Sequence, residues 1–336
     1  MRHATWMFLA AVIVLGWGLG GCGSPVAEHL AAVQTIPGGG EGGWDYITID
    51  SSAGRAYVAR STRVMVISLG GQGLVGEVAD VAGAHGVALA PTQNLGFATS
   101  GKDGTVNVFD LKTLAALRKI PAGQKPDAIL FDPASRKVFA FNHGSGDVTI
   151  IDPANLDAAP VTLAVGGTLE FGVTDNAGRV YVNVEDKSEV AVIDSKQGKV
   201  IARWSVKPGA QPTGLAIDVT HRRLFVGCSN RKMIILDADC GKLLGDVPVG
   251  SGVDGVAFDA SLGVALSANG RDGTATAVAE FAPGQFAAVQ TITTAKGART
   301  VSADLGKHRF YFPCTQPAKS GKGEFGLLVV GPPAKK

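Results

Sequence analysis

The sequence lacks a surplus of charge of either sign. Its 31 basic and 29 acidic residues give a formal net charge of +2 over 336 residues. A protein that binds nucleic acid through the phosphates usually carries a clear basic excess on one face. Charge alone therefore gives no support for a nucleic-acid partner or for binding to an anionic lipid surface.

Several catalytic motifs are also missing. The sequence contains no HExxH, paired CxxC, GxSxG or GxxxxGK[ST] motif, so zincin, redox-thiol, α/β-hydrolase and P-loop chemistry lack their characteristic residues. Histidine is scarce as well, with six in the chain, of which His3 and His29 precede the repeats described below. The remainder are too few at matching positions to predict a four-histidine iron site.

Long apolar runs are confined to the N-terminus. Residues 6–19 form an apolar run that follows Arg2 and His3, and its length is typical of a secretory signal rather than of a membrane span. The run ends in Leu19-Gly20-Gly21-Cys22, which resembles a bacterial lipobox. We therefore predict a signal peptide over residues 1–21 and lipidation of Cys22, with ordinary cleavage nearby as the alternative. The mature domain, residues 22–336, is expected in the periplasm or at the cell surface, anchored to the outer membrane.

What the sequence has in abundance is a repeat. Apolar pentads that end in a turn residue recur with their last residues at Ser68, Asp110, Asp152, Asp194, Asp237 and Ala279. A period of about 42 residues, with four short β-rich segments in each unit, is typical of a β-propeller blade. Forty-six glycines are consistent with the many tight turns that such strands require. Counting the first strand of each unit gives seven blades.

The last blade is incomplete at the C-terminal end of the chain. The missing fourth strand is supplied from the N-terminus, because residues 31–36 repeat residues 287–292, the fourth strand of the sixth unit, letter for letter. We therefore predict an all-β, seven-bladed β-propeller whose ring closes when the N-terminal strand pairs into the last blade. Closure removes the open sheet edges that would otherwise pair with other chains.

The repeat resembles a known family. Arg179-Val180-Tyr181-Val182-Asn183, followed by residues 190–194 and Gly198-Lys199-Val200, is similar to the YVTN repeat of bacterial YncE-like β-propeller proteins. The resemblance covers residues 26–331. It implies the fold, but it implies little about activity, since such propellers have been linked to DNA binding, to cell-surface roles and to lactonase, lyase and dehydrogenase activities.

Candidate site residues come from the start of each innermost strand. These positions lie on one face of a propeller, around the central channel, and we call them the mouth ring: Asp45, His85, Asp127, Glu170, Thr213, Asp254 and Arg299. Arg60 and His143 lie on adjoining loops of the same face. A residue copied only for structure should keep one type, and the mouth ring shows five. We therefore predict that these nine residues line a ligand site.

The chemistry of the mouth ring favours a cation. Carboxylates that crowd at a channel mouth repel one another, which stabilises a bound cation or raises their pKa values. Oxygen ligands with one imidazole suit Ca²⁺, Mg²⁺, Mn²⁺ or Fe²⁺. The predicted metal ligands are Asp127, Glu170, Asp254 and His85. The alternative is that these polar groups merely bond the backbone of the neighbouring blade.

These observations favour binding over catalysis. We expect an exported, lipid-anchored scaffold whose mouth binds a small molecule or an envelope protein. One alternative is a metal-assisted lactonase or lyase in which His85 moves a proton. The other is DNA binding, which needs a basic and aromatic stripe. The basic residues of this face are scattered among as many carboxylates and do not form one: Arg60, Lys102, Arg271 and Arg299. Nucleic acid is therefore not an expected partner.

The remaining cysteines are expected to be free thiols. Cys228 and Cys240 follow strands that end on different faces, about 20 Å apart, and Cys228 and Cys314 lie two blades apart. A disulfide needs Cα atoms within about 7 Å of each other. We therefore predict no disulfide among these three residues.

Overall fold

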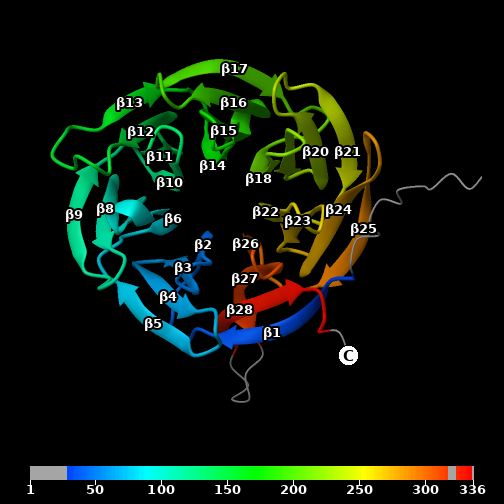
Figure 1. Cartoon of the computed structure of the whole chain (residues 1–336), viewed down its shortest axis with the longest axis horizontal. Coiled ribbons are helices and arrows are strands. Elements are labelled where there is room, and N and C mark those ends of the chain that lie inside the picture. The colour runs from blue at the N-terminus through cyan, green and yellow to red at the C-terminus, as the bar shows by residue number, and fades with distance from the viewer. Residues whose placement is uncertain (1–28, 317–322, 335–336) are drawn as a thin grey trace, which may run out of the picture.

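The computed structural model describes residues 29–316 and 323–334. Seven four-stranded antiparallel sheets surround a central channel (Figure 1), so the predicted seven-bladed β-propeller is confirmed. The predicted signal peptide and the predicted lipidation site, Cys22, lie outside the described residues. Within the described residues, no helix is long and apolar enough to cross a membrane.

Six blades run from the channel outward in chain order, and the seventh does so for its first three strands. The innermost strands are β2 (Ile47–Asp50), β6 (Ala84–Ala90), β10 (Pro126–Asp132), β14 (Leu169–Thr174), β18 (Pro212–Asp218), β22 (Val253–Asp259) and β26 (Ser302–Asp304). The second strands are β3 (Arg55–Arg60), β7 (Leu95–Ser100), β11 (Lys137–Asn142), β15 (Arg179–Val184), β19 (Arg223–Cys228), β23 (Val264–Asn269) and β27 (Arg309–Gln316).

The outer half of each blade repeats the same order. The third strands are β4 (Arg63–Ser68), β8 (Thr105–Asp110), β12 (Asp147–Ile151), β16 (Glu189–Asp194), β20 (Lys232–Asp237), β24 (Thr274–Ala282) and β28 (Glu324–Gly331). The outermost strands are β5 (Gly73–Val78), β9 (Ala116–Pro121), β13 (Val161–Ala164), β17 (Lys199–Ser205), β21 (Leu243–Pro248), β25 (Gln285–Thr293) and β1 (Ala31–Pro37). Short 3₁₀ turns occur at η1 (Pro91–Gln93) and η2 (Glu185–Lys187).

The ring closes through the N-terminal strand. β1 pairs antiparallel with β28, with Ala32 opposite Val330 and Ile36 opposite Leu327, and the two strands lie side by side in Figure 1. The last sheet therefore has the order β1-β28-β27-β26. This is the closure that the repeated six-residue segment predicts.

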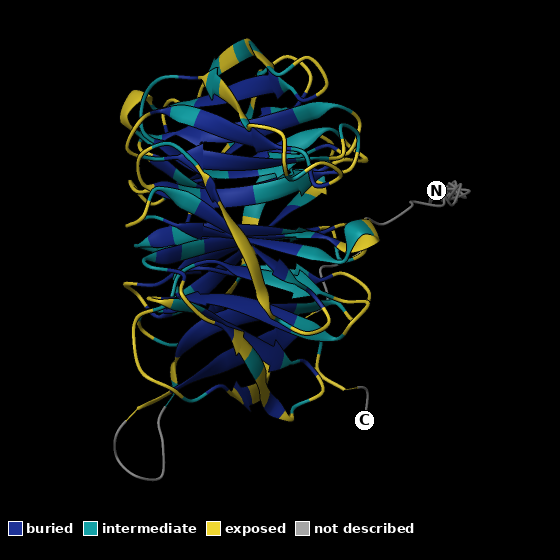
Figure 2. Cartoon of the chain, turned by 90° about the vertical axis from the view of Figure 1, so that its left-hand side faces the viewer, coloured by how far each residue is buried: buried dark blue, intermediate teal, exposed yellow. Residues whose placement is uncertain are grey.

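The core lies between blades. Middle strands such as β4 are buried on both faces, whereas the outermost strand β9 is almost wholly exposed, and Figure 2 shows the buried strands through the interior with exposed turns on the two faces. Val192, Leu215 and Val226, from two adjacent blades, belong to one such cluster. Burying an aliphatic side chain of this size contributes about 1.5–3 kcal/mol, so the apolar pentads hold neighbouring blades together.

Aspartates fix the turns on the face opposite the mouth ring. Five of the innermost strands end in an aspartate whose side chain accepts a backbone N–H two or three residues later, which is an Asx turn: Asp50, Asp132, Asp218, Asp259 and Asp304. In the fourth blade Asp175 does this instead. The repeat therefore copies one local structural role around this face.

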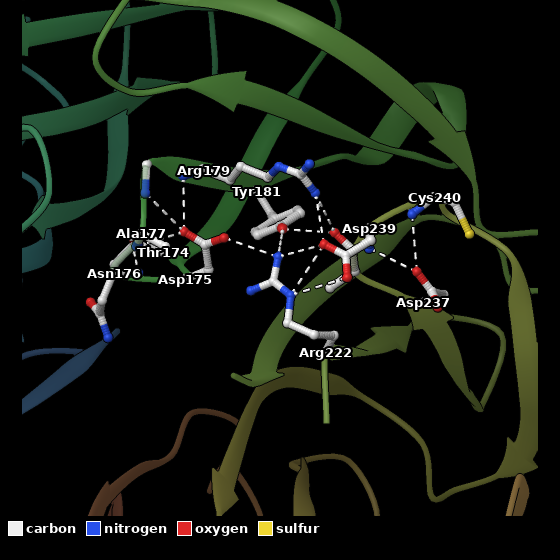
Figure 3. A network of polar contacts seen from close by, with 12 residues as sticks. Thr174, Asp175, Asn176, Ala177, Arg179, Tyr181, Arg222, Asp237, Asp239 and Cys240 are labelled. Atoms are coloured by element: carbon white, nitrogen blue, oxygen red, sulfur yellow. Dashed lines mark hydrogen bonds and ion pairs between the residues drawn. The ribbon is translucent and has the colours of Figure 1, made fainter. Parts of the chain in front are cut away.

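An ion-pair network joins the fourth and fifth blades on this opposite face (Figure 3). Arg222 Nη2 lies 3.0 Å from Asp175 Oδ2 and 2.9 Å from Asp239 Oδ1, and it also donates to the Tyr181 hydroxyl. The Asp175 side chain is 3% exposed. A buried carboxylate must be paired to be tolerated, and Arg222 supplies that pairing across the blade boundary.

The three cysteines in the described part of the chain are free, so the prediction of no disulfide among them is confirmed. Cys228 and Cys314 are buried, while Cys240 is exposed on the opposite face. Burial raises the pKa of Cys228 to about 12 and that of Cys314 to about 11. Both buried thiols are therefore protonated at neutral pH and are poor metal ligands.

Candidate functional site

An open pocket of about 1070 Å³ occupies the mouth of the channel. Tyr46, His143 and the loops after β7, β9 and β11 contribute to its lining. Six of the seven members of the mouth ring also line it: Asp45, His85, Asp127, Glu170, Asp254 and Arg299. These residues come from six different blades. The pocket is therefore built by the ring as a whole, which explains why no short stretch of sequence encodes it.

Carboxylates and cationic or imidazole groups alternate around the mouth. In blade order the sequence of contacts runs Asp254, Arg299, Asp45, His85, Asp127, then His143 with Glu170. The sequence alone predicts carboxylates that face one another as like charges. The structure instead interposes a nitrogen group between successive carboxylates, so their repulsion is partly offset.

Arg299 forms one corner of this ring. Its Nε lies 2.7 Å from Asp254 Oδ2, and its Nη2 lies 3.1 Å from Asp45 Oδ1. A guanidinium has five N–H donors in a planar fork. Arg299 can therefore satisfy the carboxylates of both neighbouring blades at once, each with its own nitrogen.

His85 occupies the equivalent position between Asp45, which it shares with Arg299, and Asp127. Its Nδ1 lies 2.6 Å from Asp45 Oδ2 and 3.1 Å from Asp127 Oδ1. Both contacts use the same ring nitrogen, which carries one proton or one lone pair. The hydrogen bond with Asp45 raises the pKa of His85.

A third group of contacts is centred on Glu170. Its Oε1 lies 3.0 Å from His143 Nδ1, and its Oε2 accepts a hydrogen bond of 3.3 Å from the Tyr46 hydroxyl. Glu170 is 8% exposed. The hydrogen bond with Glu170 raises the pKa of His143, so this contact favours the protonated form of the imidazole.

Tyr46 is the principal site residue that the sequence analysis missed. It belongs to the first blade, yet it bonds Glu170 of the fourth blade, and its ring lies 4.9 Å from that of Phe171. β2 and β14 lie on opposite sides of the channel in Figure 1, so the two aromatic rings meet across it. Tyr46 is 5% exposed and lines the pocket.

A pattern in the repeat distinguishes Tyr46 and Phe171 from the equivalent residues of the other blades. The residue after the mouth-ring position is small in most blades, because it packs against the next blade: Gly86, Ala128, Gly214, Gly255 and Thr300. A Cβ at Gly214, for example, would lie 2.9 Å from the Gly255 carbonyl carbon. Tyr46 and Phe171 are the two exceptions, and they are the two residues that cross the channel.

Burial shifts the acid–base chemistry of the mouth. Desolvation, with the nearby carboxylates of Glu170 and Asp45, raises the pKa of Asp127 well above its usual range. Desolvation and the Asp45 charge raise the pKa of Asp254 to about 6. Desolvation also raises the pKa of Tyr46. The mouth therefore holds negative charge at an energetic cost, which a bound cation would reduce.

The wall of the pocket beside the second and third blades carries basic groups, and its one carboxylate, Asp103, is paired with Lys119. Lys102 and Lys125 line it together with Gln124 and Ser145. Neither lysine forms an ion pair with a carboxylate among the residues that the structure describes. The pocket therefore has an acidic floor around the channel axis and a lysine-bearing wall to one side.

Two of the nine predicted ligand residues lie away from the pocket. Thr213 donates a hydrogen bond of 2.8 Å to the Val253 carbonyl and is absent from the pocket lining. Arg60 is 1% exposed, with its guanidinium 3.7 Å from the Phe325 ring centroid and Nη2 3.0 Å from the Gly40 carbonyl. Thr213 bonds a backbone carbonyl, and Arg60 bonds a backbone carbonyl and packs on an aromatic ring. Both side chains therefore make contacts within the fold and not in the pocket.

The predicted metal ligands are only partly brought together. Donor atoms within 4.8 Å of one another occur in two groups, Asp45 with His85 and Asp127, and Asp127 with His143 and Glu170. Asp254 belongs to neither, because Arg299 holds its carboxylate. Asp45 and His143, predicted as ligand-site residues without a metal role, take part instead.

Comparison with known proteins identifies the fold and no more. No protein-family model matches the chain, and no curated protein matches it. Among solved structures, 1687 chains are similar. One is hydrazine synthase from Kuenenia stuttgartiensis, which is 13% identical, with a TM-score of 0.68 over 92% of this chain and 98% of that chain. A fold shared so widely does not specify an activity.

Proposed function

We propose that this protein is an exported, YncE-like propeller that binds a small ligand in its mouth pocket. The observation that carries the proposal is the open pocket of about 1070 Å³, which six blades line with side chains of varied type. Pockets of 300–1000 Å³ with a few convergent polar groups are typical of small-molecule sites. A scaffold of buried strands holds these side chains in place without the need for a mobile loop.

The two charged regions of the pocket define the class of ligand. The acidic floor, with Asp127 and Glu170, favours a positively charged centre, and the wall with Lys102 and Lys125 favours an anionic group. A ligand that carries both charges can satisfy both regions at once. The preferred ligand is therefore a zwitterion, or an anion that binds together with a cation.

Thermal unfolding in the presence of three kinds of probe tests this proposal. α-Amino acids and betaines carry both charges, spermidine carries only positive charge, and citrate only negative charge. A ligand at 100 times its Kd stabilises the folded state by about 2.7 kcal/mol. We expect the zwitterions to raise Tm, and the Lys102→Ala/Lys125→Ala variant to lose the effect.

The control for this experiment is Lys112→Ala, which removes an exposed lysine from the turn after β8 on the opposite face. It should respond to the probes as the unmodified protein does. No stabilisation by any zwitterion, or an equal loss in the control variant, would contradict the proposed binding site.

Export and lipid anchoring are supported by the N-terminal sequence. An apolar segment of signal length precedes Cys22 in a lipobox-like context. Cys22→Ser should therefore move the protein from the membrane fraction to the soluble fraction, and mass spectrometry should find no acyl chains on the variant. A Cys22→Ser protein that stays in the membrane fraction would rule out this anchor.

A second candidate function is metal-assisted lactonase or lyase chemistry. The specific observation in its favour is that imidazole and carboxylate donors converge beside an open pocket. His143, held by Glu170, is the residue placed to move a proton in such a reaction, whereas His85 lies between two carboxylates. Turnover of a lactone panel with Mn²⁺ present, lost in His143→Gln, would favour this function over binding alone.

A further inference from the structure

Arg299 and His85 occupy equivalent positions in neighbouring parts of the mouth ring, and they meet their carboxylates differently. Arg299 offers Nε to Asp254 and Nη2 to Asp45. His85 offers a single nitrogen to both Asp45 and Asp127, at 2.6 and 3.1 Å. One N–H group donates well to only one acceptor. The arrangement at His85 therefore leaves one carboxylate without a full partner.

We propose that a single divalent metal ion binds between Asp45, His85 and Asp127, as the positively charged centre of the mouth pocket. This inference rests on the proposed function, because the ion would be the cation that the ligand's anionic group meets. It goes beyond that function by assigning the ligands and the class of ion.

The spacing of the donor atoms fits a coordination sphere. Metal–ligand bonds to carboxylate oxygen and imidazole nitrogen are about 2.1 Å long, so adjacent ligands at right angles lie about 3 Å apart. The distances from His85 Nδ1 to the two carboxylate oxygens are 2.6 and 3.1 Å. All three donor atoms lie within 4.8 Å of one another. The group can therefore close around an ion with small side-chain movements.

Neighbouring residues fix the orientation of these ligands. Asp45 directs Oδ2 toward His85, while its Oδ1 accepts a hydrogen bond from Arg299. The backbone carbonyl of Asp127 accepts a hydrogen bond from Thr99 Oγ1 at 2.6 Å. Such supporting contacts hold metal ligands in the productive orientation. The open pocket leaves the remaining coordination positions to water or to a bound ligand.

The class of ion follows from the donors. The predicted set had three carboxylates beside the imidazole of His85, and the structure leaves two. Nitrogen is then a larger share of the donors, which favours Mn²⁺, Fe²⁺ or Zn²⁺ over the Ca²⁺ and Mg²⁺ of the sequence-based prediction, because those two ions prefer oxygen ligands. Neither buried cysteine lines the pocket, so a thiolate-bound soft ion is not expected there.

Glu170 and His143 are outside the proposed first coordination sphere. His143 Nδ1 faces a single carboxylate at 3.0 Å, which one proton satisfies. The pair lies on the far side of Asp127, where it can accept or donate a proton near the ion. It is therefore expected to tune the site rather than to hold the metal.

Titration of the full-length protein with MnCl₂ tests the proposal, with calorimetry to measure affinity and electron paramagnetic resonance to count bound ions. We expect one Mn²⁺ per chain. His85→Gln should weaken binding at least tenfold, and Asp127→Asn should do the same. Thermal unfolding of each variant in the absence of metal verifies that it is folded.

His221→Gln is the matched control. His221 Nδ1 also lies close to a buried carboxylate, 2.7 Å from Asp218 Oδ2, but it has only that one partner and lies on the opposite face. This variant should bind Mn²⁺ as the unmodified protein does. Absence of Mn²⁺ binding at 1 mM, or an unchanged affinity in His85→Gln, would overturn the proposed metal site. Zwitterion binding by metal-free protein would then leave the proposed function standing without the ion.

Discussion

The two faces of this propeller use aspartate in opposite ways. On the opposite face, aspartates at the ends of innermost strands accept backbone N–H groups of their own turns, and the repeat copies this role around the ring. Some of them, such as Asp175, also meet a side chain of the next blade. On the mouth face, the hydrogen bonds and ion pairs of the Asp127 and Asp254 side chains are made with side chains of neighbouring blades and not with their own turns. The difference separates a residue that shapes its own turn from one that contributes to a shared site.

The pKa values of Asp110 on the opposite face and of the buried aspartates at the mouth shift in opposite directions. A backbone hydrogen bond from Thr113 lowers the pKa of Asp110, at the end of β8 on the opposite face. Burial raises the pKa of Asp127 and Asp254 at the mouth. Lowered values indicate that the fold stabilises the ionised form, whereas raised values indicate that the fold disfavours it. Ionised Asp127 and Asp254 therefore lower the stability of the fold, whereas ionised Asp110 raises it. Functional sites often lower stability in this way.

The largest expected effect comes from breaking a contact on the opposite face. Asp175 Oδ1 accepts backbone N–H groups from Ala177, Gly178 and Arg179, and Oδ2 contacts Arg222. Asp175→Ala removes all of these acceptors and leaves Arg222 partly unpaired, so the free energy of unfolding should fall by about 3 kcal/mol. Urea denaturation measures this change. Asp175→Asn, which keeps one acceptor oxygen, should lose less, and equal losses would contradict the turn role.

The next effect should have the opposite sign. Asp254 has a pKa of about 6 in the folded protein, above its usual value, so it contributes stability below its unfolded pKa and loses that contribution as pH rises through about 6. Asp254→Asn mimics the protonated form. The variant should therefore gain about 2 kcal/mol at pH 8 and almost nothing at pH 4.

Denaturant unfolding at the two pH values measures the Asp254→Asn effect. Asp157→Asn is the control, because that side chain is 88% exposed and pairs with Arg118 only at the surface. It should change stability by less than about 0.5 kcal/mol at either pH. A destabilised Asp254→Asn protein at pH 8 would show that the mouth carboxylates support the fold as those of the opposite face do.

The smallest effect is expected at the one mouth-ring position that lies outside the pocket. Thr213→Ala loses a hydrogen bond to the Val253 carbonyl, so stability should fall by about 1 kcal/mol. Binding of Mn²⁺ and of zwitterionic probes should stay unchanged. A tenfold loss of either kind of binding would place the fifth blade in the site after all.

Several parts of the structure were predictable because they depend on local pattern. Alternating turns and apolar pentads fix strand length, and their repetition fixes the number of blades. The identity of residues 31–36 and 287–292 fixed the closure of the ring, because two identical segments with the same pattern fill the same place in a blade. The position of the mouth-ring residues followed from the same register.

The contacts of those residues were not predictable in the same way. Whether Arg60 reaches the channel depends on the Phe325 ring beside it, which belongs to the last blade. Whether Tyr46 reaches Glu170 depends on the width of the channel. These contacts join residues more than a hundred positions apart, and the register of one repeat carries no information about them.

The sequence by itself determined the number of blades, the closing strand and the face on which varied polar residues gather, because each follows from periodicity and strand direction. Only the tertiary structure decided which of those residues meet. Arg299 and His85 lie between carboxylates of neighbouring blades, and the single Nδ1 of His85 contacts two of those carboxylates. Thr213 and Arg60 lie outside the pocket. Those outcomes depend on distances across the ring, which are set by how the seven blades pack.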